Sequence, residues 1–220
     1  MREAFSLIFK VPSLFASGIL SSLILSFFTF IFSFQIAELQ IFMLIRTILN
    51  FFPLILILLL VNTFLTSFII RATYEIERKN FIWKRCIQKV WKNYLNAFVG
   101  FLLYSLLSIF GLILFIIPGI VIMSRLIFYQ AIILIENKDV ISSFKKSWKV
   151  TRIKWRKVLI LLLIYIGVWL LLRIIILIPS FLSFLLYLTI SILFFPSYFV
   201  LITLTYIRMK FTHTSKHQRD

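Results

Sequence analysis

Cysteine, acidic residues and histidine are scarce in this sequence, and each shortage excludes a class of protein. The 220 residues include one Cys, seven Asp or Glu and two His. The lone Cys86 excludes an intrachain disulfide, and His213 and His217 lie in a polar tail. No acidic residue lies deep in an apolar run, and neither a glycine-rich phosphate loop nor an HExxH motif occurs. Because catalysis requires positioned acids, bases, nucleophiles or metal ligands, we expect a protein that is not an enzyme and needs no cofactor or metal.

Apolar residues, in contrast, are abundant. They make up 62% of the chain, with 26 Phe and a mean hydropathy of +1.06, whereas a soluble domain is roughly 45–50% apolar. This excess is too large for a core and indicates side chains that face lipid. The apolar runs are continuous and do not alternate, which favours helices over a β-barrel. We therefore predict an all-α, multi-pass protein with a single integral membrane domain over residues 1–220.

The apolar runs predict about six membrane-spanning helices, since the bilayer core requires roughly 20 helical residues per span. The first run is too long for a signal peptide and is interpreted as a retained span. Residues 36–52 are apolar but carry several polar side chains, so they form either a helix in the outer interface or an additional span. Pro118 and Gly119 predict a tight turn. The predicted spans are residues 12–34, 53–70, 94–117, 120–135, 158–178 and 182–207.

Two basic segments have the pattern of amphipathic helices, with apolar residues on one face and Lys or Arg on the other. We predict that both lie against the inner leaflet. Similarity between residues 76–118 and 135–179 suggests a repeated hairpin as a hypothesis. The predicted apolar faces are Trp83, Cys86, Ile87, Val90, Trp91 and Tyr94 in one helix and Val140, Ile141, Phe144, Trp148 and Trp155 in the other. The predicted leaflet contacts are Lys84, Arg85, Lys89, Lys145, Lys146, Lys149 and Arg152.

The placement of the basic residues predicts the orientation. With six spans, the N-terminus, residues 71–92, residues 136–157 and the C-terminal tail lie on one side and hold 21 of the 24 Lys and Arg. Basic residues concentrate in cytoplasmic loops, so we predict that both termini are cytoplasmic. Orientation explains the net charge of +17 without nucleic acid. Anionic phospholipid is the expected partner, while protein partners and the oligomeric state stay open.

Two arginines, Arg125 and Arg173, lie inside predicted spans. A charged side chain near the bilayer centre costs about 2.5–3.5 kcal/mol, so it is a candidate for function. Arg125 lies about 9 Å and Arg173 about 7–8 Å from the outer end of its span. One interpretation is that they reach the outer interface or pair with Glu38. The other is that they hold a lipid phosphate or another anion in the outer half of the bundle.

The stretch 118–157 resembles the membrane domain of some glycerophosphodiester phosphodiesterases and of related prokaryotic multi-pass proteins. The shared pattern is a Pro-Gly pair, an Arg seven residues after the Pro, a Glu at the end of that helix and a later Ser-Trp pair. In this chain these residues are Pro118, Gly119, Arg125, Glu136, Ser147 and Trp148. The resemblance implies a multi-span fold in the prokaryotic cytoplasmic membrane. It does not imply phosphodiesterase activity, because this chain has no room for the soluble catalytic barrel.

Two functions fit these patterns. The first is a non-enzymatic integral membrane protein that organises or senses lipid or partner proteins at the cytoplasmic leaflet. The alternative is a small transporter or lipid-moving protein, which would need a polar cavity that reaches the middle of the membrane.

Overall fold

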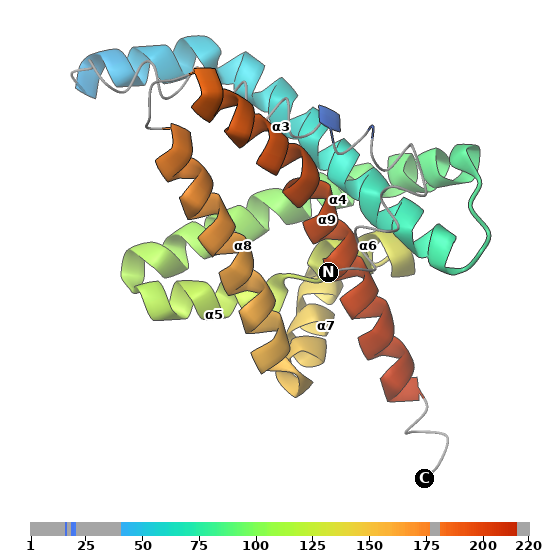
Figure 1. Ribbon diagram of the computed structural model, residues 1–220. Helices are drawn as coiled ribbons and strands as arrows, with labels where there is room; N and C mark the ends of the chain where they lie inside the picture. The colour runs from blue at the N-terminus through green and yellow to red at the C-terminus, as the bar shows by residue number, and fades with distance from the viewer. Residues whose placement is uncertain (1–15, 17–18, 21–40, 177–180, 215–220) are drawn as a thin grey trace.

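The computed structural model describes residues 16, 19–20, 41–176 and 181–214. Helices joined by short links make up this part of the chain, and no strand occurs in it (Figure 1). The all-α prediction is therefore confirmed for the described residues. The helices are α3 (Ile41–Glu77), α4 (Trp83–Leu114), α5 (Ile116–Leu126), α6 (Tyr129–Glu136), α7 (Val140–Ile153), α8 (Trp155–Ile176) and α9 (Phe181–Thr214).

Five helical segments in the described part are long and apolar enough to cross a membrane. They overlap five of the six predicted spans, while the remaining prediction, residues 12–34, lies almost entirely outside the described residues. The five segments are Phe52–Glu77, Trp83–Leu114, Ile116–Glu136, Trp155–Leu172 and Thr189–Lys210.

Helix α3 is longer than the sequence indicated. Residues 36–52 were predicted to be separate from the span that begins at Pro53, but residues 41–77 form one helix with Pro53 inside it. Apolar surroundings penalise an unpaired backbone group, so a proline in such a helix need not end it. The 37 residues of α3 make a helix about 55 Å long.

Helix α4 joins two elements that were predicted to be separate, the first basic helix and the span 94–117. On the apolar face predicted for its first turns, Trp83, Ile87 and Trp91 are exposed, while Cys86 and Val90 are buried. Small side chains allow helices to approach closely, so the small residues of α4 are buried and the bulky ones remain outside. The buried residues of α4 are Cys86, Val90, Asn93, Ala97, Gly100, Ser108 and Gly111.

The hairpin between α4 and α5 turns at Phe115, whose backbone is extended (φ −159°, ψ 141°). Pro118 and Gly119 were predicted to form this turn, but both lie inside α5. Gly119 instead permits close packing of the two helices (Figure 1). A Cβ atom on Gly119 would lie 2.7 Å from the backbone nitrogen of Leu112, and one on Gly111 would lie 2.8 Å from the Cα of Gly119.

The predicted span 120–135 is broken between α5 and α6, at Ile127 and Phe128. Helix α7 supplies hydrogen bonds at this break. The backbone N–H of Phe128 donates to the hydroxyl of Ser147 over 3.2 Å, and the same hydroxyl donates to the carbonyl of Arg125 over 2.8 Å. The hydroxyl of Thr151 lies 3.2 Å from that carbonyl. Ser147 therefore stabilises an interrupted helix through its backbone groups.

The second basic segment, residues 140–157, was predicted to be one helix but contains the whole of α7 and the first residues of α8. Helix α7 ends at Ile153, and α8 begins at Trp155 after a change of backbone direction at Lys154 (φ −125°, ψ 37°). The first basic segment continues without interruption into α4, so the two halves of the hypothesised repeat differ here.

The buried face of α7 consists of small hydroxyl residues. Ser143, Ser147 and Thr151 are buried at helical spacing, while Ile141 and Trp148 are exposed. Asp139 caps the start of α7, since its carboxylate accepts hydrogen bonds from the hydroxyl and the backbone N–H of Ser142. These bonds hold the pKa of the Asp139 carboxyl below its usual value. The buried residues Ser143, Ser147 and Thr151 have short side chains, which allow α7 to lie close to its neighbours.

The centre of the bundle is aromatic and aliphatic. Helix α9 packs against α3 on one side and α8 on the other (Figure 1). Tyr206 of α9 and Phe128 are buried, with ring centroids 5.7 Å apart. Tyr165 of α8 stacks on Tyr198 of α9 with a centroid distance of 4.0 Å. These contacts fix the end of α9 relative to the α5–α6 break.

Candidate functional site: the basic end of the bundle

Several helices meet at one end of the bundle, which we call the basic end. Here α3 ends, α4 and α8 begin, α6 passes into α7, and α9 reaches Lys210. Three contacts between helices define this end: Lys89 with Glu75, Asn93 with Asn137, and Lys210 with Glu136. The basic end therefore gathers charged groups from segments that are far apart in the sequence.

Glu136, a residue of the 118–157 pattern, connects three helices. Its Oε1 atom accepts from the hydroxyl of Tyr206 (2.6 Å) and the ammonium of Lys210 (2.9 Å), both on α9. Its Oε2 atom accepts from the ammonium of Lys146 on α7 over 2.5 Å. The carboxylate is 9% exposed, so it is largely removed from water and its charge is balanced by its neighbours. Lys146 was among the predicted leaflet contacts; its ammonium bonds to Glu136, and its side chain is 32% exposed.

A second ionic cluster joins α3, α4 and α6. The guanidinium of Arg71 donates to the carbonyl of Leu134 over 2.8 Å and to the carboxylate of Glu75 over 2.5 Å. The ammonium of Lys89 lies 3.1 Å from the same carboxylate. Arg71 and Glu75 have side chains only 4% and 6% exposed. Lys89 was among the predicted leaflet contacts; its ammonium bonds to Glu75, and its side chain is 40% exposed.

Sequence reasoning missed Arg71, which it counted only among the charges of a basic loop. Arg71 and Glu75 are four residues apart on a helix, a spacing that brings opposite charges together. That spacing is a signal in the sequence that could have identified the ion pair. It does not indicate that the pair is buried, because burial depends on the packing of α4 and α6 over Arg71 and Glu75.

Arg125 lies against α7, with its guanidinium carbon 5.6 Å from the centroid of the Trp148 ring. Its Nη1 atom is buried and has no hydrogen-bond partner among the described residues. Since Arg125 contacts α7, an outer-half position for Arg125 and an inner-leaflet position for α7 cannot both hold. Arg173 belongs to α8, but its side chain lies outside the described part of the structure, as does Glu38.

Five of the predicted leaflet contacts remain exposed: Lys84, Arg85, Lys145, Lys149 and Arg152. The carboxylates in the described part of the chain form no ion pair with them. They lie on the outer sides of α4 and α7, whereas Lys89 and Lys146 on the same helices bond to carboxylates inside the bundle. The basic end therefore has an inner set of paired cations and an outer set that is available to an anionic partner.

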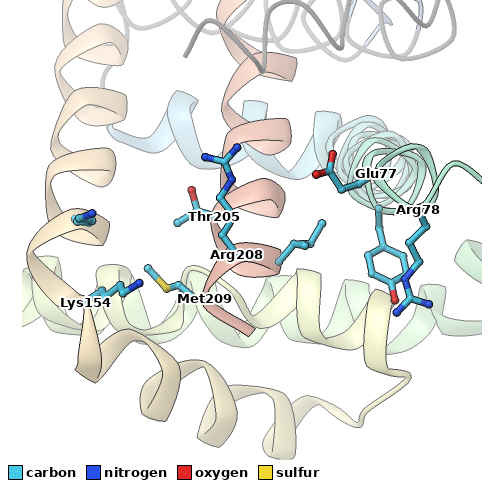
Figure 2. A pocket seen from close by; sticks show the side chains of 9 residues that line it. Glu77, Arg78, Lys154, Thr205, Arg208 and Met209 are labelled. Carbon is cyan, nitrogen blue, oxygen red and sulfur yellow. The ribbon is translucent and has the colours of Figure 1, made fainter. Parts of the chain in front are cut away.

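A cleft with a volume of about 740 Å³ opens at the basic end. Its walls come from the end of α3, the region where α8 begins, and α9 (Figure 2). In Figure 2, Lys154 lies on one side, Glu77 and Arg78 lie on the other, and Arg208 lies between them. The lining contains four basic side chains and one carboxylate. The complete lining is Tyr74, Glu77, Arg78, Lys154, Lys157, Thr205, Ile207, Arg208 and Met209.

None of these lining residues was among the predicted site residues. The three segments that form the cleft are separated by about 75 and 50 residues, and no local pattern connects them. Within the described residues, no group of three or more His, Cys, Asp or Glu side chains is placed to hold a metal ion.

Comparison with known proteins places the chain in a family. No curated protein and no solved structure matches this chain. One family model, described as a domain of unknown function (DUF7847), matches residues 87–211. The match covers α5, α6, α7 and α8 completely, together with most of α4 and of α9, and it extends over more than half of the sequence. The chain therefore belongs to the DUF7847 family.

Proposed function

We propose that this protein is a non-enzymatic, multi-pass protein of the cell membrane that gathers anionic phospholipid at the cytoplasmic leaflet. The observation that carries this proposal is the two-sided structure of α7. Its inner side is fixed to the bundle through Ser147 and Lys146. Its outer side presents Lys145, Lys149 and Arg152. A rigidly held row of exposed cations suits a charged surface better than it suits a catalytic site.

The magnitudes support lipid as the partner. Each Lys or Arg near an anionic leaflet contributes about 1 kcal/mol. Trp148 and Trp155 are 46% and 45% exposed, and tryptophan favours the headgroup boundary. Three exposed cations with two neighbouring indole rings therefore provide both parts of an interfacial contact.

The orientation is tested by cysteine labelling in a Cys86→Ala background. Cys86 itself is buried, so it cannot report on access. A cysteine at Lys145 should react with a membrane-impermeant thiol reagent only after cell lysis. A cysteine at Phe115, on the exposed hairpin turn, should react in intact cells and serves as the control. Labelling of the Lys145 position in intact cells would contradict the proposed orientation.

The lipid partner is tested with the triple variant Lys145→Gln, Lys149→Gln and Arg152→Gln. In nanodiscs that contain phosphatidylglycerol and phosphatidylethanolamine, we expect its enrichment of phosphatidylglycerol to fall about fivefold or more, since three favourable charge contacts are lost. Native mass spectrometry of the retained lipids measures the ratio. The matched control, Lys145→Arg, Lys149→Arg and Arg152→Lys, keeps the charge and should keep the enrichment. An unchanged ratio in the glutamine variant rejects lipid and leaves a partner protein at this surface.

The transporter alternative has less support. Gln130 of α6 donates to the hydroxyls of Thr66 and Ser67 on α3 over 3.2 and 3.1 Å. These buried polar groups form hydrogen bonds with one another, so these donors and acceptors are already used and are not available to a transported substrate. The cleft described above opens at the basic end, whereas a transporter requires a polar cavity near the middle of the membrane.

A further inference from the structure

We infer that the cleft at the basic end is a binding site for a phosphate ester. This inference rests on the proposed function and deepens it, since it assigns one defined ligand position in addition to a charged surface. The cleft residues belong to α3, α8, α9 and the links beside them, whereas the leaflet-facing cations proposed above belong to α7. The two features can therefore be altered separately.

The charge of the cleft favours an anion. Arg78, Lys154, Lys157 and Arg208 line it against the single carboxylate of Glu77, which leaves a formal excess of three positive charges. The ion pairs of the described residues do not include Lys154 or Lys157. Like charges that share one cavity repel one another, and a phosphate between them removes that repulsion.

Arg78 is held in a position that suits phosphate. Its guanidinium carbon lies 4.7 Å from the centroid of the Tyr74 ring, which also lines the cleft. A planar guanidinium can donate two parallel hydrogen bonds to phosphate oxygens, and contact with an aromatic face reduces its freedom before a ligand binds. The carbonyl groups of Tyr74, Glu75 and Ile76 accept bonds from Arg78, Asn80 and Lys79, so the end of α3 presents few unpaired carbonyl groups to an anion.

The opposite wall adds to the preference for anions. Helix α8 begins at Trp155, between Lys154 and Lys157. Backbone N–H groups at a helix N-terminus carry partial positive charge, which favours phosphate when basic side chains stand beside it. The volume of about 740 Å³ lies within the usual range for small-molecule sites.

The wall formed by α9 also contains apolar side chains, which favour an esterified phosphate over the free ion. Ile207 and Met209 of α9 line the cleft together with Tyr74. A phosphate ester presents an anionic end to the cations and a carbon-bearing end to these side chains. A phospholipid headgroup and a soluble phosphate ester share this chemistry, and the experiment below distinguishes them.

The experiment titrates the full-length protein in detergent with dihexanoyl phosphatidylglycerol and, in a second arm, with glycerol 3-phosphate. Native mass spectrometry counts the bound molecules. We expect one saturable site whose affinity falls about fivefold for each charge removed in Lys154→Gln and Lys157→Gln. Tighter binding of the lipid assigns the site to a headgroup, and equal binding of the two ligands assigns it to a soluble ester. The absence of saturable binding in both arms overturns the inference.

Glu77→Gln provides a test with the opposite sign. Removal of the only carboxylate in the lining should increase the affinity for either ligand about fivefold, which a variant that merely damages the fold cannot do. An unchanged or weaker affinity in Glu77→Gln contradicts the inference.

Variants on α7 separate this inference from the proposed function. Lys145→Gln with Lys149→Gln should leave the saturable site intact while it reduces the general enrichment of anionic lipid. If the α7 variants reduce that enrichment and the cleft variants change nothing, the proposed function stands and the inference fails. If the cleft variants alone have an effect, the inference stands and the surface proposal fails.

Discussion

Arg71→Met is expected to destabilise this protein by about 3 kcal/mol, the lower end of the cost of breaking a buried ion pair. The substitution leaves the carboxylate of Glu75, which is 6% exposed, with Lys89 as its remaining cation. The carbonyl of Leu134 also loses its bond from Arg71. For a chain of this size the change corresponds to a fall in thermal midpoint of about 6–12 °C, measured by scanning fluorimetry in detergent.

Two further variants test whether the loss of stability comes from the unpaired carboxylate of Glu75. Arg85→Met makes the same replacement at an exposed arginine and should change the unfolding free energy by less than about 0.5 kcal/mol. Arg71→Met combined with Glu75→Leu removes both buried charges and should recover most of the loss, because apolar replacements for a whole ion pair are often neutral. If the double variant is less stable than Arg71→Met, the unpaired carboxylate is not the cause.

Gly119→Ala is expected to destabilise the protein by about 2–3 kcal/mol, the upper range for adding volume to a packed interface. The new Cβ atom would lie 2.7 Å from the backbone nitrogen of Leu112. A flexible side chain can move away from such a contact, but the backbone of α4 cannot move without separating the hairpin. The thermal midpoint in detergent measures the loss, and Gly111→Ala should behave in the same way because its Cβ atom would meet the Cα of Gly119 at 2.8 Å.

The other glycines provide a graded control. No atom lies within 4 Å of a Cβ atom on Gly167, so Gly167→Ala should be neutral or should add about 0.5–1 kcal/mol through helix propensity. At Gly100 the nearest atoms belong to the side chains of Ile133 and Tyr129 at 3.1 Å, so an intermediate loss is expected. Equal midpoints for Gly119→Ala and Gly167→Ala would show that close approach in the hairpin does not matter.

Composition was enough to predict a helical protein with several helices long and apolar enough to cross a membrane, and the physical reason is simple. In an apolar medium each backbone group must be paired within its own segment, so long apolar runs leave little choice of structure. The ends of the helices were less predictable. Nothing in the sequence near Lys154 resembles the Gly and Pro signals that usually end helices, yet a break occurs there, and no such signal explains the break at Phe128.

The residues that α4 and α7 bury were not predicted from the sequence. The rule that bulky apolar residues point inward belongs to proteins surrounded by water. In α4 and α7 the buried positions are small, as with Ala97, Ser143 and Ser147, while Trp91 is 72% exposed. Small buried residues and exposed bulky ones are the pattern expected of helices in lipid, where close approach of the backbones decides the packing.

Part of the candidate site could be predicted. Glu136, Ser147 and Trp148 were identified from the 118–157 pattern, and the structure gives each of them contacts between elements. The pairing of Lys89 and Lys146 was not predicted, because a basic residue on a helix looks the same whether its partner is a lipid or a carboxylate on another helix. The cleft depends on three distant segments, so only the fold reveals it.

The hydrogen bonds across the α5–α6 break also constrain the order in which the chain can fold during its synthesis. Ser147 lies 19 residues after Phe128, so the ribosome makes it about 1–4 s later at ordinary rates of synthesis. For the last 11 residues of that interval, from Glu136 to Ser147, the nascent chain contains the complete segment from Ile116 to Glu136 but not the hydroxyl that accepts from the N–H of Phe128. This segment therefore cannot reach its final backbone pairing by itself. Its backbone pairing is completed only after α7 has been made, so a helix outside the apolar run supplies part of the hydrogen bonding of Ile116–Glu136.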